Sequence, residues 1–338
     1  MLNYDDYKKY AHTLDVKITK SNDNIISFTP YVYNSCSANC MFCSEKLARK
    51  ANSDFINKEL CEESKNFYIQ QLNKVFAFLK GKNVFLSISG KEPTESLYHL
   101  QLLRDETNKY ITSGGNIVEK VMYSNLSGFT KKFNELIEFC HDIKLTRIEC
   151  SRHHFDEKIN QEIVRFKPNE IIKENRVFSD LVQKITKNDI PVKVVCVMQK
   201  CGISNVEEIE EYIEFMSDYG ISQIVFRELS MFENSIVNSK TVEYINKNRI
   251  ELKEILDIIS ASTKFTIKEI KEGYYYYSFC YKYVGNKKVI DVVFEMSDYE
   301  EMIKHHNSNE LNKIILYPNG NISKDWNIMK EILGENNA

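Results

Sequence analysis

Three cysteines lie close together near the start of the chain, at Cys36, Cys40 and Cys43. Their spacing is C-x3-C-x2-C within the segment YNSCSANCMFCSEKL. Turn-forming residues such as Asn34 and Asn39 surround them and allow the chain to wrap around one point. Thiolates at this density are typical of zinc or of an iron–sulfur cluster, because both prefer soft sulfur ligands. The spacing therefore predicts a metal centre.

The missing fourth ligand distinguishes these two alternatives. A structural zinc ion takes four protein ligands, but the next cysteine is Cys61 and no histidine follows before His99. A [4Fe–4S] cluster held by three cysteines leaves one iron available to a small chelating molecule. We therefore interpret the motif as a cluster site and keep a zinc-binding module as a distant alternative. The other cysteines are scattered, and most are expected to be small buried side chains: Cys61, Cys140, Cys150, Cys196, Cys201 and Cys280.

Apolar periodicity and turn signals divide residues 25–229 into alternating strands and helices. The predicted strands are Ile25–Tyr33, Val84–Ser89, Val118–Tyr123, Leu145–Cys150, Val192–Met198 and Gln223–Phe226. Helical patterns lie between them at Asn57–Leu79, Leu97–Tyr110, Lys131–Cys140, Phe178–Lys187 and Val206–Tyr219. This alternation predicts an α/β fold with a parallel sheet, which we interpret as a partial (β/α)6 TIM-like barrel.

The chain on either side of this region has a different pattern. Residues 1–24 form an N-terminal extension. Residues 230–338 contain a predicted helix at Val242–Ser260. Short strand candidates follow at Phe265–Ile270, Tyr274–Tyr281, Val289–Phe294 and Ile314–Tyr317. We expect this last region to form a small C-terminal α+β cap that packs on the barrel.

Polar residues follow most of the predicted strands. The cysteines follow the first strand, SGKEPT (89–94) the second and SNLSG (124–128) the third. SRHH (151–154) follows the fourth strand, and Arg227 follows the sixth. In parallel α/β folds the chemistry lies beyond the carboxyl ends of the strands. We therefore expect these residues to meet at one rim of the barrel.

On these segments the sequence resembles the radical S-adenosylmethionine (SAM) superfamily. The three-cysteine spacing after the first strand, with Phe42 before the last cysteine, is the signature of that superfamily. SGKEPT resembles its Gly-Gly-Glu-Pro element, with Lys91 in place of the second glycine. YSNLSG is similar to the segment that approaches the SAM ribose. IVFREL is similar to the sixth strand of the subgroup that contains the molybdenum-cofactor cyclase, and the resemblance covers Ile25–Leu229.

The resemblance implies a cofactor set and its ligands. Cys36, Cys40 and Cys43 would bind three irons of one [4Fe–4S] cluster, and SAM would chelate the fourth iron. Gly90, Glu92 and Pro93 would hold the methionine part of SAM, Ser124 and Asn125 its ribose, and Arg227 its carboxylate or an acidic substrate. Electron transfer from the cluster would cleave SAM to a 5′-deoxyadenosyl radical, which removes a hydrogen atom from the substrate.

Several of these residues also have a structural interpretation. Glu92 carries a charge that the start of a helix favours. Ser124 and Asn125 are typical helix-capping residues. Arg227 can form an ion pair with the neighbouring Glu228.

Candidates for substrate chemistry follow the fourth strand at Arg152, His153 and His154. A guanidinium binds a carboxylate or phosphate bidentately, and a histidine can hold substrate or move a proton. An ordinary capped loop before a helix is the alternative. Cys280 is a further candidate because some radical SAM epimerases, which this sequence resembles in its core motifs, use a thiol to return a hydrogen atom. A small buried side chain is the simpler interpretation of Cys280.

Composition restricts the class of protein. The chain has 338 residues and a net charge of −3, which argues against non-specific binding of nucleic acid. No apolar run reaches the roughly 18 residues of a membrane span, and the first residues lack the apolar centre of a signal peptide. We therefore expect no membrane association and a cytoplasmic protein with reduced thiols.

The predicted function is a radical SAM enzyme that acts on a small polar metabolite, such as a nucleoside, sugar-acid or amino-acid derivative. Decarboxylation, rearrangement or epimerisation in a biosynthetic pathway is the expected outcome. Modification of a ribosomally made peptide is the alternative. Only residues 1–24 precede the first strand, which disfavours a peptide-docking domain there, although a separate protein could present the peptide. The chemistry implies a reducing partner such as flavodoxin or ferredoxin. After Cys201 only Cys280 remains, so we expect no auxiliary cluster.

Overall fold

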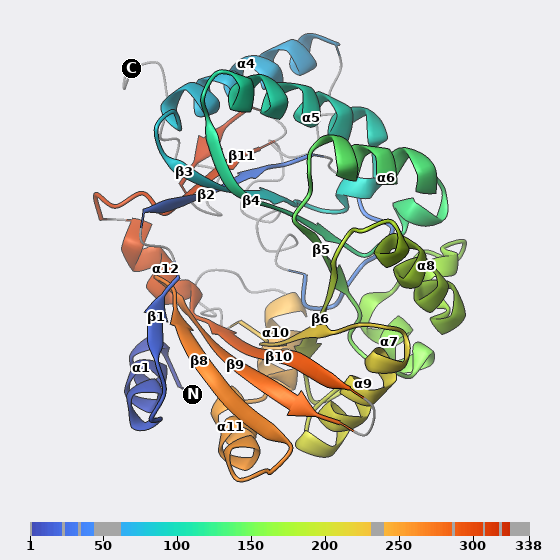
Figure 1. Cartoon of the computed structure of the whole chain (residues 1–338), viewed down its shortest axis with the longest axis vertical. Coiled ribbons are helices and arrows are strands. Elements are labelled where there is room, and N and C mark those ends of the chain that lie inside the picture. Colours follow the sequence, from blue (N-terminus) through green and yellow to red (C-terminus); the bar gives the residue numbers. More distant parts are fainter. Residues whose placement is uncertain are drawn as a thin grey trace.

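The computed structural model describes residues 2–21, 24–32, 35–43, 62–230, 240–285, 288–306, 308–317 and 320–324. Within these residues one sheet curves into an open barrel, and helices cover its outer side (Figure 1). Cys61 and the first residues of the predicted helix Asn57–Leu79 lie outside the described residues.

The central part of the barrel consists of six parallel strands whose spatial order follows the chain. They are β2 (Ile25–Pro30), β3 (Asn83–Ile88), β4 (Asn116–Ser124), β5 (Arg147–Ser151), β6 (Val192–Met198) and β7 (Gln223–Glu228). The connecting helices are α4 (Glu62–Phe78), α5 (Leu97–Thr112), α6 (Phe133–Asp142), α7 (Glu157–Val164), α8 (Asn175–Lys187) and α9 (Val206–Asp218). Short 3-10 helices lie at η1 (Pro93–Glu95), η2 (Gly128–Thr130) and η3 (Ile171–Lys173). The predicted α/β fold with a partial (β/α)6 TIM-like barrel is confirmed.

The C-terminal strands continue the same sheet on both sides of the six central strands. They are β8 (Phe265–Glu272), β9 (Tyr276–Val284), β10 (Val289–Ser297), β11 (Lys313–Leu316) and β12 (Ile322–Ser323), with α12 (Tyr299–His306) before β11. Strand β10 pairs in parallel with β7, and β11 pairs in parallel with β2. The strands expected in this region are present, but their hydrogen bonds make them part of the barrel sheet instead of a separate cap. The full order is β1-β8-β9-β10-β7-β6-β5-β4-β3-β2-β11-β12, where β1 is Ile18–Lys20.

The N-terminal extension and the helix predicted over Val242–Ser260 differ in detail from the sequence prediction. The N-terminal extension forms α1 (Tyr4–Thr13) and then β1, which pairs in parallel with β8. The single helix predicted over Val242–Ser260 is instead two helices, α10 (Lys240–Asn248) and α11 (Leu252–Ser260). The chain leaves the helical conformation between them at Glu251, whose ψ of 119° is extended.

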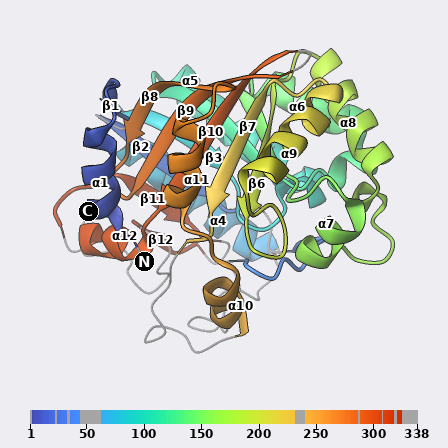
Figure 2. The same cartoon turned by 90° about the horizontal axis from the view of Figure 1, so that it is seen from below.

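The two faces of the sheet have different surroundings. Successive side chains of a strand point to opposite faces. On β7, Phe226 packs against Tyr212 of α9 with ring centroids 5.4 Å apart, so the residues on either side of Phe226 point into the barrel. Helix α10 lies beyond the carboxyl end of β7 (Figure 2).

Among the described residues, no helix combines the length and apolarity that a membrane span requires.

Candidate functional site

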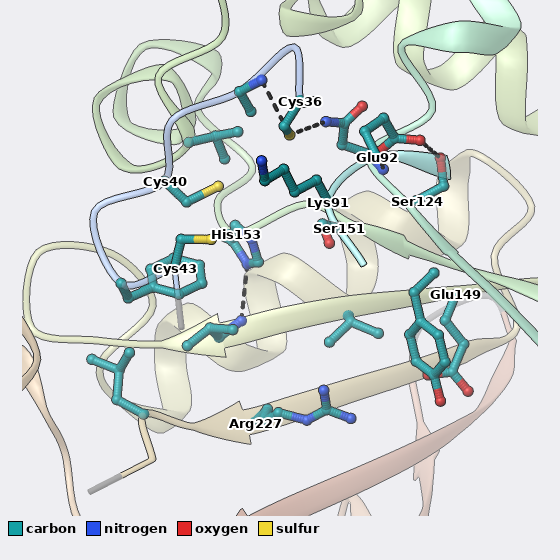
Figure 3. Close-up of a pocket in the computed structure, with 18 of the residues that line it drawn as sticks. Cys36, Cys40, Cys43, Lys91, Glu92, Ser124, Glu149, Ser151, His153 and Arg227 are labelled. Atoms are coloured by element: carbon teal, nitrogen blue, oxygen red, sulfur yellow. Dashed lines mark hydrogen bonds between the residues drawn. The ribbon is translucent and has the colours of Figure 1, made fainter. Parts of the chain in front are cut away.

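A cavity of about 380 Å³ lies at the carboxyl ends of the six central strands (Figure 3). Each of these strands, or the loop that follows it, contributes to the lining. The predicted site residues in the lining are Cys36, Cys40, Cys43, Gly90, Glu92, Ser124, Asn125, His153 and Arg227. The structure therefore brings most of the predicted rim residues into one cavity.

Two neighbouring loops hold the loop that carries the three cysteines. The backbone N–H of Asn39 donates to the carbonyl oxygens of Val164 and Arg165, at 3.1 Å each. On the other side, Ser37 Oγ donates to Ser127 Oγ at 2.7 Å, and both residues are fully buried. These contacts fix the loop so that Cys36, Cys40 and Cys43 all line the cavity.

The sulfur of Cys36 accepts two N–H hydrogen bonds. The donors are Ala38 N at 3.4 Å and Asn125 Nδ2 at 3.6 Å. Burial, with a contribution from the Glu92 carboxylate, raises the pKa of the thiol to about 12. Binding of a metal centre would have to displace this proton. The two N–H donors would then stabilise the thiolate and its bond to iron.

The donor set fits a cluster. Among the described residues, no three His, Cys, Asp or Glu side chains are arranged to hold a single metal ion. A [4Fe–4S] cluster makes a different demand, because each cysteine binds a separate iron atom. Three thiols that line one cavity, one of them with two N–H donors, meet that demand.

Gly90 is required by the geometry of the second loop. Its φ is +113°, a backbone conformation that side chains with a Cβ rarely adopt. A Cβ at this position would also lie 2.8 Å from Cδ1 of Tyr31, whose ring is buried. Glycine therefore allows the backbone of this loop to pass between Tyr31 and the cavity.

Glu92 joins the loops at the ends of β2, β3 and β4. Its carboxylate accepts hydrogen bonds from Ser124 Oγ and from Asn125 N, both at 2.6 Å, and its own N–H donates to Ser35 O at 3.1 Å. Burial raises the pKa of the Glu92 carboxyl, and these donors oppose the shift. Both oxygens thus have protein donors, which gives Glu92 a role in assembling the site in addition to any contact with a ligand.

Ser124 and Asn125 also stabilise the turn that follows β4. Leu126 N donates to Ser124 Oγ at 2.8 Å, and Ser127 N donates to Asn125 Oδ1 at 2.9 Å. These bonds order a turn and do not cap a helix, because the N-cap of η2 is Ser127, which has no side-chain capping bond. Both Ser124 and Asn125 line the cavity as well. Pro93 is buried at the first position of η1 and is not part of the cavity lining.

His153 is a neutral donor on the cavity wall. Its Nδ1 accepts a hydrogen bond from Val197 N at 3.0 Å, so the ring proton is on Nε2. Burial, followed by the charges of Arg152 and Arg227, lowers the pKa of His153 to about 3. The edge of Phe42, from the cysteine loop, packs against this ring with centroids 5.0 Å apart.

Arg152 and His154 lie outside the cavity lining, contrary to the prediction that they contact substrate. The Arg152 guanidinium donates to the carbonyl oxygens of Ile172 and Lys173, at 3.2 and 3.0 Å, and stacks on Phe178. His154 Nδ1 accepts from Asp156 N at 2.9 Å, which orders the start of α7. The alternating geometry of the segment directs only His153 toward the cavity, so the structure gives its two neighbours structural roles.

Arg227 lines the cavity from β7, opposite the cysteine loop (Figure 3). Its Nε lies 2.8 Å from Oε1 of Glu295 on β10. Burial disfavours the charge, but the carboxylates of Glu295 and Glu149 outweigh it and raise the pKa of Arg227. The expected ion pair with Glu228 is not the one observed, because Glu228 pairs with Arg249 at 3.0 Å.

Cys280 lies on the inner face of the sheet but does not belong to the cavity lining. In register it stands beside Val293, which stands beside Val225, two residues before the inward-facing Arg227. Burial raises the pKa of its thiol. The structure therefore places Cys280 away from the cysteine loop, and a direct role at the cavity has no support from geometry.

The structure adds Tyr123 and Glu149 to the predicted lining. Lys91 and Ser151, which belong to the predicted rim segments but were given no role, line the cavity as well. Tyr123 and Glu149 are register partners on β4 and β5, so they face the cavity side by side. Strict alternation from His153 back along β5 would have found Ser151 and Glu149. Glu149 is also held by Arg147, with the two atoms Oε1 and Nε 2.9 Å apart.

Comparison with known proteins supports the fold. No protein-family model matches the sequence, and no curated protein matches it significantly. Streptococcus suis SuiB bound to its precursor peptide SuiA is similar at a TM-score of 0.51 and 13% identity, over 91% of this chain and 61% of that chain. SuiB bound to S-adenosylmethionine matches at a TM-score of 0.45 and 14% identity, over 90% and 58%. Native anSMEcpe with bound AdoMet matches at 0.44 and 12%, over 60% and 50%.

SuiB, the protein of the SuiB–SuiA structure, is a radical SAM enzyme, and the sequence motifs resemble that superfamily. At 13% identity, the likeness to the SuiB–SuiA structure establishes a shared fold. The chain spans about 61% of the length of that SuiB chain.

Proposed function

We propose that this chain is a radical SAM enzyme that holds one [4Fe–4S] cluster through Cys36, Cys40 and Cys43, with SAM bound at the remaining iron. The observation that carries the proposal is the meeting of two segments in one cavity. The three thiols of the C-x3-C-x2-C loop and the loop of Gly90, whose φ is positive, line the same 380 Å³ space. The shared fold with SuiB supports it.

When bound, the cluster and SAM supply a 5′-deoxyadenosyl radical that removes a hydrogen atom from an unactivated C–H bond. The chain positions the reactants. Gly90 lets the backbone approach the methionine part of SAM, and the Glu92 network keeps this loop fixed relative to Ser124 and Asn125. An external reductant such as flavodoxin or ferredoxin supplies the electron.

The wall opposite the cysteines favours a small polar substrate. Arg227 keeps its charge because Glu295 pairs with one side of its guanidinium. Neutral His153 and the Tyr123 hydroxyl add uncharged polar groups to the same lining. A guanidinium in such a setting binds carboxylate or phosphate. We therefore propose an anionic metabolite, such as a nucleoside-linked sugar acid or an amino-acid derivative.

A second candidate is the modification of a ribosomally made peptide. The similar SuiB structure contains its precursor peptide SuiA. On this alternative, Arg227 would bind an acidic residue of the peptide.

Anaerobic reconstitution followed by incubation with SAM and dithionite tests the proposal. We expect about four irons per chain and formation of 5′-deoxyadenosine. A colourless protein that binds zinc instead would contradict it. A second experiment distinguishes the two substrate classes. The enzyme is incubated in deuterated water with a panel of anionic metabolites or with peptides encoded beside the gene. The substrate class is the one whose members change in mass.

A further inference from the structure

Lys91 departs from the glycine-rich element that its segment otherwise resembles, and it belongs to the cavity lining. Figure 3 shows its side chain extending into the cavity toward the loop of Cys36 and Cys40. Lys91 is not among the positive-φ residues of the described chain, unlike its neighbour Gly90. The backbone therefore accepts a side chain here, and the side chain points at the proposed cluster ligands.

We propose that Lys91 places a fixed positive charge beside the cysteine-bound cluster and raises the reduction potential of that cluster. This inference rests on the proposed function. A lysine ammonium is a compact, singly charged group on a flexible stem, and charge near a cluster is one of the means by which a protein sets its potential.

The placement of the charged lining residues decides which cation lies beside the proposed cluster. Of the described lining residues, Lys91 and Arg227 carry the positive charges. Arg227 stands on the opposite wall, where its Nε lies 2.8 Å from Oε1 of Glu295. Of the three acidic lining residues, Glu149 pairs with Arg147 and Glu228 pairs with Arg249. The third, Glu92, accepts hydrogen bonds from Ser124 Oγ and Asn125 N. Of the two cationic lining residues, Lys91 is therefore the one on the cysteine side of the cavity.

The direction of the shift in reduction potential follows from the net charge of the oxidised and reduced cluster. A [4Fe–4S] core of charge +2 with three thiolates carries a net charge of −1. Dithionite supplies one electron, which reduces the core to +1 and the assembly to −2. A nearby ammonium stabilises the more negative state more than the less negative state. Lys91 consequently makes reduction easier, which would help an external donor to load the cluster.

The test is a redox titration of the reconstituted full chain, followed by electron paramagnetic resonance and performed without SAM. Omitting SAM ensures that a loss of SAM binding cannot produce the shift. We compare wild type with Lys91→Met and Lys91→Gln, which remove the charge, and with Lys91→Arg, which retains it. Lys193→Met is the matched control, because Lys193 projects from β6 beside Glu149 at 3.7 Å but does not line the cavity.

We expect both neutral variants to hold the same iron as wild type but to need a lower potential. At a fixed potential the ratio of reduced to oxidised cluster should fall by about tenfold, which corresponds to about 59 mV for one electron. Lys91→Arg and Lys193→Met should titrate with wild type. Unchanged midpoints in both neutral variants, or an equal shift in Lys193→Met, would overturn the inference. A wild-type chain that assembles no cluster would instead overturn the proposed function.

Discussion

Arg152 and Arg227 illustrate how burial and partner decide what a residue does. Both lie at the carboxyl end of a central strand, where Arg152 is buried and the Arg227 side chain is 31% exposed. The Arg152 guanidinium donates hydrogen bonds to backbone carbonyl oxygens of the segment before α8. Burial lowers its pKa to about 10. Arg227 meets a carboxylate on one side and the cavity on the other. The two roles differ because the two side chains point to different faces of the sheet. A shift of one residue in strand register would exchange the faces, and sequence patterns do not determine register that closely.

At the residue scale, Gly90→Ala should destabilise the protein more than Gly81→Ala. Both glycines have positive φ, but a Cβ on Gly81 meets nothing within 4 Å, whereas one on Gly90 lies 2.8 Å from the Tyr31 ring. Urea denaturation should show a loss of about 1 kcal/mol in the free energy of unfolding for Gly81→Ala. Gly90→Ala should lose a further 1–3 kcal/mol, on the order of other overpacked sites. Equal losses would show that Tyr31 does not restrict this position.

His153 gives a prediction on pH dependence. Its pKa is lowered from 6.5 to about 3, so between these values the unfolded chain binds a proton that the folded chain does not. The free energy of unfolding contributed by this residue is therefore complete above pH 6.5 and is lost as the pH falls toward 3. His153→Gln should flatten the pH dependence of stability in this range, by at most about 1.4 kcal/mol per pH unit. The control is His12→Gln, which replaces a histidine whose side chain is exposed, and an equal flattening in this variant would contradict the assignment to His153.

At the scale of elements, contacts between strand ends and loops hold the site together. The end of β7 is tied to the start of α11, since Glu228 accepts hydrogen bonds from Arg249 and from Leu252 N. This tie explains why the predicted helix over Val242–Ser260 is interrupted. The Arg249 side chain is 5% exposed, and the break lets it reach a carboxylate that is 1% exposed.

Arg249→Met should therefore be severely destabilising. The substitution leaves Glu228 buried without its cation, and burial already raises the pKa of that carboxyl to about 7. We expect a loss of about 3–5 kcal/mol in the free energy of unfolding, measured with urea. Lys304→Met, which breaks an exposed pair with Glu301, should cost under about 1 kcal/mol. The double variant Glu228→Gln/Arg249→Met should recover part of the loss, and an equally unstable double variant would contradict the ion-pair explanation.

At the scale of the whole molecule, the sheet is larger than the sequence pattern indicated. The six central strands could be predicted because apolar runs and helical periodicity alternate along the chain. The placement of β8–β12 could not, because it depends on which sheet edges remain unpaired after the central strands form. Strand β10 covers the edge of β7 and β11 covers the edge of β2, contacts between residues far apart in sequence. The same long-range pairing brings Glu295 to Arg227, which lines the cavity.

The cysteine motif was the most predictable part of the site, because its spacing is local. The grouping of Tyr123, Glu149 and Arg227 on the cavity wall was the least predictable feature, because strand register alone brings these three residues together. Local chemistry could thus be predicted from residue types, whereas substrate contacts required the assembled barrel.

Cleavage of SAM by the Cys43→Ala variant tests the central claim most directly. The reconstituted variant, wild type and a Cys201→Ala control, whose exposed thiol lies outside the cavity lining, are incubated with SAM and dithionite under anaerobic conditions. We expect wild type and the control to form 5′-deoxyadenosine and Cys43→Ala to form none, because one iron of the cluster has lost its ligand. Formation of 5′-deoxyadenosine by Cys43→Ala at the wild-type rate would contradict the assignment of the three cysteines as cluster ligands.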